Sequence, residues 1–178
     1  MSSDTRSRIQ AVARELFLQQ GVQNTSLRQI SERLGITKPA LYYHFASRDD
    51  LVRSIVQPLI EDVERFVATR EPGGEARRLL EDYFELIWRH RDVTVMIVRE
   101  LHTLGYMDLG QRMFDWRRRL IELLLGPGIT QEQRIRATVA LGGMSDCTVE
   151  YAHLAAEEVK PTAVDAAAAA LGLPQTAM

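Results

Sequence analysis

Chemically versatile side chains gather in one short stretch, residues 35–51, which reads GITKPALYYHFASRDDL. The stretch supplies ammonium, phenol, imidazole and guanidinium groups, from Lys38, Tyr42, Tyr43, His44 and Arg48. Groups of these kinds bind the phosphate oxygens of DNA and the hydrogen-bonding edges of its bases. A helix that exposes them indicates DNA recognition. The alternative is a solvated helix whose tyrosines cover apolar neighbours or a dimer interface.

Helical geometry separates a buried side of this stretch from an exposed one. Leu41 and Phe45 are four residues apart and share a face, which we expect to pack, with Ile36, against the core. Tyr43 lies nearly opposite that face. The predicted exposed surface comprises Lys38, Pro39, Tyr42, Tyr43 and His44, with Arg48 just beyond.

Helix-capping residues predict that this helix is the second helix of a helix-turn-helix motif. Ser26 and Gln29 match a capping box for a short helix that Gly35 ends. Thr37 is the expected cap of the next helix, and Pro39 lies in its first turn, where the missing N–H costs little. Two short helices joined by a turn of about three or four residues are the signature of this motif. An amphipathic helix over residues 5–20 must cover them, because such short helices are marginal alone.

Helical patterns continue through the rest of the chain. Ser47 and Asp50 predict a cap for a long helix that runs to about residue 70, with a kink at Pro58. Further helices are expected over residues 76–90, 93–104, 108–125 and 131–159, and a last one opens at Pro161. No alternation with period two indicates a strand. The predicted fold class is all-α, about nine helices, with a helix-turn-helix unit over residues 1–50 and a helical body over residues 51–178.

The composition is that of a packed globular protein, with 46% hydrophobic and 26% charged residues. Cys147 is the single cysteine, so we expect no internal disulfide, no cysteine zinc site and a reduced, cytoplasmic setting. No leader pattern opens the chain and no apolar run approaches about 18 residues, so no membrane partner is expected. Residues 1–48 hold seven Lys or Arg against three acids, while the remainder is acidic overall. This asymmetry indicates that one end meets a polyanion.

Residues 25–51, TSLRQISERLGITKPALYYHFASRDDL, resemble the DNA-binding segment of the TetR family of bacterial transcriptional repressors. The family's segment has a threonine, a helix with Ile-Ala, then Gly-Val, then Leu-Tyr-x-His-Phe-x-x-Lys-x-x-Leu. The likeness extends over about residues 5–52. Departures are small, since Ser31 stands for the usual alanine and Arg48 for lysine, with the charge kept.

The resemblance implies a homodimer that binds double-stranded operator DNA and is joined through the last two helices of each subunit. It also implies a helical body that binds a small-molecule effector, whose identity is open; no metal or other cofactor is expected. Carried over by position, the residues that face bases are Thr37, Lys38, Pro39, Ala40 and Tyr43. Those that hold phosphates are Tyr42, His44 and Arg48, with further contacts from Thr25, Ser26 and Arg28.

The body holds side chains that would suit an apolar ligand pocket with a few polar groups. The candidate residues are Tyr83, Trp88, His102, Tyr106, Met113, Phe114, Asp146, Cys147 and Tyr151. Asp146 is expected among apolar neighbours, where an unpaired carboxylate would be costly. The alternatives are ordinary core for the aromatic residues and an Asp146–arginine bridge across the dimer. Small apolar faces for dimerisation are expected at Ala152, Ala155, Ala156, Val164, Ala167, Ala168 and Leu171.

Two rival classes stay open. A small helical enzyme would have to use residues such as His90, His102, His153 or Cys147, yet the sequence has no HExxH, GxSxG, P-loop or GxGxxG motif. The expectation is therefore that the protein is not an enzyme. The second rival is a DNA-binding or partner-binding regulator that has a filled body and takes no ligand.

Overall fold

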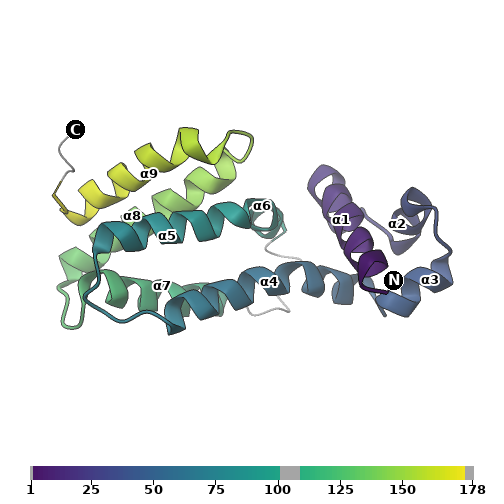
Figure 1. Ribbon diagram of the computed structural model, residues 1–178, viewed down its shortest axis with the longest axis horizontal. Helices are drawn as coiled ribbons and strands as arrows, with labels where there is room; N and C mark the ends of the chain where they lie inside the picture. The colour runs from purple at the N-terminus through teal and green to yellow at the C-terminus, as the bar shows by residue number, and fades with distance from the viewer. Residues whose placement is uncertain (1, 101–108, 175–178) are drawn as a thin grey trace. The chain divides into compact units, whose positions relative to one another are not determined.

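The computed structural model describes residues 2–100 and 109–174 of the protein. Over these ranges the chain forms nine α-helices and no strand, which confirms the all-α prediction. In chain order the helices are α1 (Ser2–Gln20), α2 (Leu27–Leu34), α3 (Lys38–His44), α4 (Arg48–Ala68), α5 (Ala76–Arg89), α6 (Arg91–Arg99), α7 (Leu109–Leu125), α8 (Gln131–Glu150) and α9 (Ala156–Leu171) (Figure 1).

The described residues divide into two compact units. The head consists of residues 2–61 and 95–100, and the body consists of residues 62–94 and 109–174. The chain passes from head to body within α4 and from body to head within α6. The functional division at residue 50 stays a prediction, as does the kink at Pro58, which lies inside a helix that continues to Ala68.

The head is built around the apolar face of α1. Ile9 and Phe17 lie on this face and are at most 2% exposed. Ile30 of α2, together with Leu41 and Phe45 at α3, is fully buried in the same unit. Burying one such side chain contributes about 1.5–3 kcal/mol. Packing of this kind explains how α3, with only seven residues, persists as a helix.

The boundary between the last two helices differs from the predicted one. The sequence pattern predicts one helix that continues to residue 159 and a next one that opens at Pro161, but α8 ends at Glu150 and α9 begins at Ala156. Glu158 caps the N-terminus of α9: its carboxylate accepts a hydrogen bond from Ala155 N (3.0 Å). Because Ala155 carries no capping side chain, the sequence signal was weak. Pro161 is exposed inside α9, near its start.

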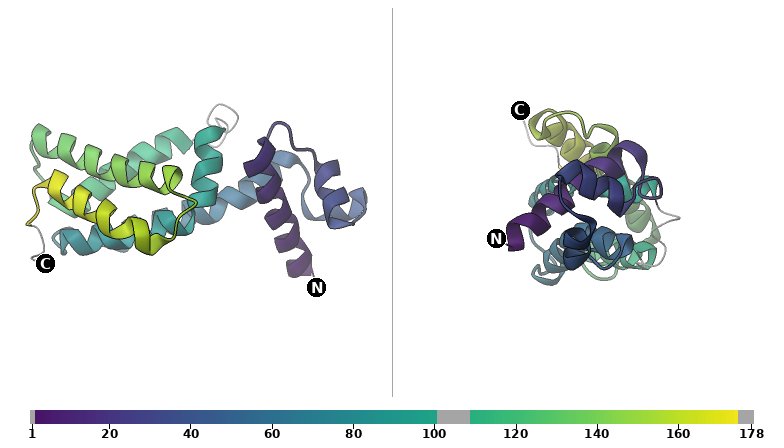
Figure 2. Two further views of the ribbon diagram at one scale, coloured as in Figure 1. Left: turned by 90° about the horizontal axis from the view of Figure 1, so that it is seen from above. Right: turned by 90° about the vertical axis from the view of Figure 1, so that its right-hand side faces the viewer.

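The body packs α5 against α7, α8 and α9, and α8 and α9 lie side by side (Figures 1 and 2). Val164, Ala167 and Ala168 of α9 are at most 3% exposed within the single chain. Their assignment to an intersubunit face was therefore wrong, because they already pack inside their own subunit. The predicted helix over 93–104 ends at Arg99, and residues 101–104 lie outside the described ranges. In the described part of the chain, no helix is both long and apolar enough to span a bilayer.

Candidate nucleic-acid interface

The first helix of the helix-turn-helix begins at the predicted capping box. The Ser26 hydroxyl accepts a hydrogen bond from Gln29 N (3.2 Å), and the Gln29 side-chain oxygen accepts one from Ser26 N (2.7 Å). Two of the donors that a helix start leaves unsatisfied are thereby paired. Gly35 ends α2 in the left-handed region, at φ +66°, which a residue with a side chain adopts at a cost.

The second helix begins at Thr37, whose hydroxyl accepts a hydrogen bond from Ala40 N (3.3 Å). Pro39 lies in the first turn of α3, as predicted. The Ser47 hydroxyl likewise accepts a hydrogen bond from Asp50 N (3.0 Å) at the start of α4. Three caps within residues 26–50 therefore set the lengths and entry points of α2, α3 and α4.

The face that α3 presents to solvent matches most of the predicted surface, but His44, predicted to be exposed, is half-buried, and so is Ile36, predicted to pack against the core. Leu41 and Phe45 are fully buried, whereas Tyr43 is 82% exposed and Tyr42 is 45% exposed. The Lys38 ammonium lies 5.6 Å from the centre of the Tyr42 ring. This cation–π contact places a positive charge next to the Tyr42 phenol. Lys38, Pro39 and Ala40 are also exposed. This helix can present aromatic, hydroxyl and cationic groups to the edges of bases.

A groove of about 530 Å³ runs beside α3 in the head. It is lined by residues of the α1–α2 turn, the starts of α2 and α4, and α3: Gln23, Asn24, Thr25, Ser26, Leu27, Arg28, Lys38, Tyr42, Ala46, Ser47, Arg48 and Asp49. Six of the predicted DNA-binding residues are thus brought together. Three of these six carry positive charges, against one carboxylate in the lining, Asp49. The first residues of α2 and α4 also line the groove, and helix N-termini favour anions, so the site is suited to anionic oxygens.

Two of the predicted contact residues have internal partners. Thr25 is fully buried, and its hydroxyl donates to the Gly21 carbonyl (2.8 Å), so its side chain closes the α1–α2 turn and does not reach the surface. Arg48 donates to the carbonyls of Val22 (3.3 Å) and Gln23 (3.1 Å). Its guanidinium therefore holds the same turn while lining the groove.

The carboxylate of Glu32 also partners a predicted contact residue. It lies 2.7 Å from Arg28 Nε, and this hydrogen bond raises the pKa of the guanidinium. Both side chains are exposed, so the pair is weak and exchangeable. Arg28 thus remains fully charged at the mouth of the groove.

A contact that the sequence analysis missed secures the α1–α2 turn from α6. The Glu100 carboxylate accepts a hydrogen bond from Val22 N (3.0 Å), and Arg99 donates to the carbonyl of Leu18 (3.1 Å). Gly21 has φ +86°, and a Cβ there would lie 2.7 Å from Glu100 Oε1. The turn therefore needs glycine for its backbone angle, and a Cβ there would displace the end of the Glu100 side chain from Val22 N.

The predicted pocket residues of the body are placed apart. Tyr83 makes a hydrogen bond with Ser145 (3.3 Å), burial raises the pKa of its phenol, and Trp88 stacks on Phe84 inside the core. Cys147 is half-buried, and burial raises the pKa of its thiol. The remaining described residues, Met113, Phe114, Asp146 and Tyr151, are exposed in the single chain.

The expected apolar environment of Asp146 was wrong, because this carboxylate lies on the exposed side of α8. Its position in the sequence, beside Cys147 and a run of small residues, did not reveal the orientation of the helix. His102 and Tyr106 lie outside the described residues. Among those described, no group of three or more His, Cys, Asp and Glu side chains is placed to hold a metal ion.

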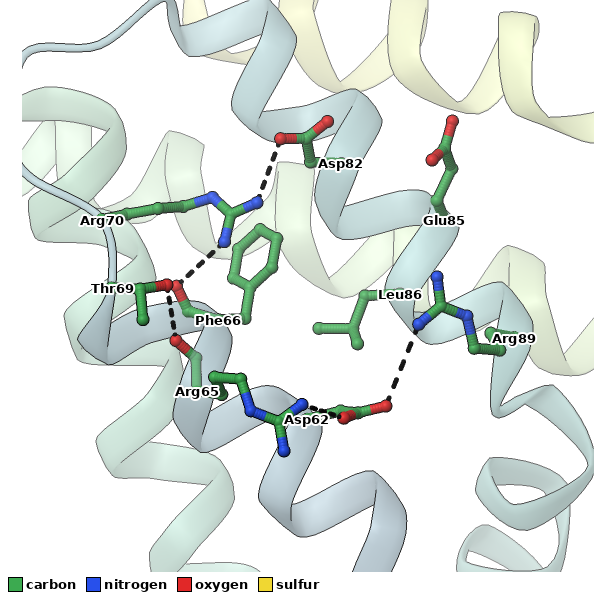
Figure 3. A pocket seen from close by; sticks show the side chains of 9 residues that line it. All are labelled: Asp62, Arg65, Phe66, Thr69, Arg70, Asp82, Glu85, Leu86 and Arg89. Atoms are coloured by element: carbon green, nitrogen blue, oxygen red, sulfur yellow. Dashed lines mark hydrogen bonds and ion pairs between the residues drawn. The ribbon is translucent and has the colours of Figure 1, made fainter.

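A polar groove of about 310 Å³ lies between α4 and α5 in the body. Figure 3 shows Arg65 and Arg89 directed at Asp62 toward one end, and Arg70 directed at Asp82 toward the other. Each of these arginines has a carboxylate partner. The groove is thus better described as an ion-pair network that joins two helices than as a set of open ligand donors.

The Asp62 carboxylate in this network has a pH-dependent role. A hydrogen bond from His90 (2.9 Å) is the main cause that lowers the pKa of Asp62. A carboxyl whose pKa is lower in the folded protein stabilises it above the unfolded value of about 4, and loses that effect as the pH falls through the folded value.

We expect Asp62→Asn to lower the free energy of unfolding by about 0.2–1 kcal/mol at neutral pH, and the difference from wild type to shrink as the pH falls below about 4 and through the lower folded pKa of Asp62. Urea unfolding between about pH 3 and 7 measures this. Glu71→Gln, at an exposed carboxyl in the α4–α5 connection, is the control and should show no such trend. A difference that persists unchanged at the lowest pH would show that ionic pairing is not the cause.

The fold and the site together define a helix-turn-helix protein with a separate helical body. Residues 9–55 match the family described as bacterial regulatory proteins, tetR family. The chain is 44% identical over 54 residues to the HTH-type transcriptional regulator AcrR of Shigella flexneri, which covers 30% of this chain and 25% of that protein. It is 32% identical over 89 residues to TtgR of Pseudomonas putida, covering 47% and 42% of the two chains.

Solved structures resemble most of the chain. A TerR/AcrR-family transcriptional regulator of Aquifex aeolicus aligns with a TM-score of 0.74 at 22% identity, covering 90% of this chain and 95% of that one. The ketosteroid transcriptional regulator KstR2 of Mycobacterium tuberculosis aligns with a TM-score of 0.69 at 21% identity, covering 94% and 93%. At these identities the likeness establishes the fold.

Over residues 9–55 the chain therefore has the N-terminal segment of the family described as bacterial regulatory proteins, tetR family. The curated relatives that match this segment are named transcriptional regulators. The matched segments span between 25% and 43% of the curated relatives.

Proposed function

We propose that the protein is a homodimeric, cytoplasmic transcriptional repressor that binds a palindromic DNA operator through two heads and is released by a small-molecule ligand in the body. The observation that carries the DNA-binding part is the α3 surface. Tyr43 stands 82% exposed on a helix whose opposite face is fully buried, and a cationic groove adjoins it. No core function accounts for a phenol so exposed.

In this proposal the groove takes the DNA backbone and α3 takes the base edges. Lys38 and Arg28 line the groove beside the helix start at Ser26, where backbone N–H groups favour a phosphate. Tyr43 and the first turn of α3 enter the major groove. Thr37, Pro39 and Ala40 stay assigned to base contacts, and Tyr42 and His44 to phosphates.

Two heads are needed because one offers few phosphate contacts. Helix-turn-helix dimers read half-sites about 34–36 Å apart, one helical turn of DNA, which is why the operator should be palindromic. The dimer is proposed to form through α8 and α9. Support comes from α8, where Ile135 is 57% exposed and Val139 is 62% exposed, with an adjoining shallow groove of about 540 Å³.

The ligand part rests on the family and on the polar pair that Tyr83 and Ser145 form inside the body. A regulator with a filled body and no ligand is the competing proposal. Thermal shift and gel-shift assays with metabolites of the neighbouring genes separate the two. Operator complexes that resist every compound would favour the filled body.

The DNA-binding proposal is tested by selecting duplexes from a random library with the wild-type protein and measuring affinity for the selected and scrambled sequences. Tyr43→Ala is expected to weaken binding to the selected duplex roughly 10- to 100-fold and to leave scrambled DNA nearly unchanged. Arg48→Ala should weaken both and reduce the slope of log affinity against log salt by about 0.9.

Equal losses on both duplexes for the Tyr43 variant would contradict its base-reading role. Because Arg48 also holds the α1–α2 turn, its variant is compared at a temperature well below its melting transition. Failure of the wild-type protein to select any sequence would reject the proposal itself.

A further inference from the structure

The side chain of one α1 residue, Arg6, reaches the C-terminal end of α3. Arg6 Nη1 donates a hydrogen bond to the carbonyl of His44 (3.0 Å), across a separation of 38 residues. The guanidinium carbon lies 4.4 Å from the centre of the Phe45 ring. A single side chain thus makes a hydrogen bond and a cation–π contact to two consecutive residues at the end of the reading helix.

The end of α3 has reason to need such a partner. A helix leaves its last four carbonyls unpaired, and α3 consists of only seven residues, with His44 the last. Helices often close with a left-handed glycine, but Phe45 ends α3 in an extended conformation, at φ −140°. Its N–H returns to the carbonyl of Leu41 (3.0 Å), and Arg6 supplies a donor and a positive charge for the carbonyl of His44.

The same contact controls where the chain leaves α3. Phe45 is fully buried, so its ring is a fixed surface on which the Arg6 guanidinium can rest. Tyr43, which is 82% exposed, lies one residue before His44, and the two ring centroids are 5.3 Å apart in an edge-to-face arrangement. A loosened end of α3 would let both rings change direction together.

We propose that Arg6 is a positioning residue for base recognition: it joins the first turns of α1 to the C-terminal end of α3 and thereby fixes the direction of Tyr43. This inference rests on the proposed DNA-binding function. It differs from a phosphate contact, in which Arg6 would add affinity to any DNA sequence and contribute to the salt dependence. It also differs from a purely structural role, which would lower specific and non-specific binding in parallel.

The test compares Arg6→Ala, Arg6→Lys and the control Arg8→Ala, which removes an exposed arginine two residues further along α1. Affinities for a duplex selected by the wild-type protein and for its scrambled form are measured at several salt concentrations, with melting curves for each variant. We expect Arg6→Ala to weaken binding to the selected duplex about 5- to 10-fold, the scale of a hydrogen bond from a charged group in a partly exposed site. The affinity of the Arg6→Ala variant for scrambled DNA should be no lower than that of the Arg8→Ala variant.

The slope of log affinity against log salt should match wild type for the selected duplex. Arg6→Lys, which keeps the charge and a donor but lacks the planar guanidinium, should recover part of the lost specificity. If Arg6→Ala reduces this slope by about 0.9 and lowers the affinity for both duplexes equally, Arg6 contacts a phosphate and the positioning role is rejected. Unchanged affinity, or parallel losses that follow a lower melting temperature, would also overturn the inference. If the wild-type protein selects no DNA sequence, the proposed DNA-binding function itself is rejected. If it selects one and Arg6→Ala has no effect on specificity, only the role of Arg6 is rejected.

Discussion

Val139→Asp is expected to convert the protein to a monomer and to weaken its binding to the operator by about 10²–10⁴-fold. Val139 is 62% exposed on the side of α8 opposite its buried residues, and Ile135 lies one turn earlier on the same side. In the proposed dimer these side chains would lose their contact with water. An aspartate there would bury an unpaired carboxylate, which is costly.

The predicted loss of DNA affinity follows from the linkage of two heads. When one head is bound, the second meets its half-site at a high effective concentration, which raises overall affinity by about 10²–10⁴-fold without any new contact. Loss of the dimer removes that gain while each head stays folded. Sedimentation measures the oligomeric state, and gel shift on full and half operators measures the affinity.

Val98→Asp is the matched control, because it places the same charge at another exposed valine, 47% exposed on α6. It should leave the sedimentation of the protein unchanged. A Val139→Asp variant that still sediments as a dimer would place the interface elsewhere. A monomeric variant that binds the full operator as tightly as wild type would contradict the two-head mechanism.

The local elements of the head could be predicted because each is specified by residues close together in the chain. Ser26 pairs with Gln29, and Thr37 with Ala40, three positions apart in both cases. The alternation of buried Leu41 and exposed Tyr43 is likewise a property of one helix. Such signals survive without knowledge of the tertiary fold.

The contacts that hold these elements in place could not be predicted. Arg6 meets His44 across 38 residues, and Glu100 meets Val22 across 78. In the sequence, Arg6 is only one of several positive charges in a basic segment. Its position at the end of α3 depends on the tertiary packing of α1 and α3, which the sequence does not show locally. The sequence predicts Gly21 as a helix stop, but it does not predict that the Glu100 carboxylate lies beside it.

In the body, periodicity found the helices but not their orientation. Small residues on α9 are compatible with either an intersubunit face or close packing within the chain, and Val164 and Ala168 pack within it. Asp146 illustrates the same ambiguity on α8, since a rotation of the helix decides between a buried carboxylate and an exposed one. Rotation is set by all the neighbouring helices at once and has no local signal.

Phe45→Ala is expected to destabilise the head by about 3–5 kcal/mol, the range for emptying a buried phenylalanine site. Phe45 is fully buried at the end of α3, and the Arg6 guanidinium packs over its ring. Hydrogen exchange of the α2 and α3 amides should accelerate by roughly 10²–10⁴-fold, because about 1.4 kcal/mol corresponds to a factor of ten. Amides of α8 and α9, in the other compact unit, should keep their protection.

Phe114→Ala, the same chemical change at a side chain that is 69% exposed, is the matched control and should alter stability by less than about 0.5 kcal/mol. Phe45→Leu adds a finer comparison, because it retains most of the apolar volume but removes the aromatic face beneath Arg6. If Arg6 acts through that face, Phe45→Leu lowers DNA specificity with only a modest loss of stability, and a second substitution, Arg6→Ala, adds little further loss. Additive losses in the double variant would mean that the two residues act independently.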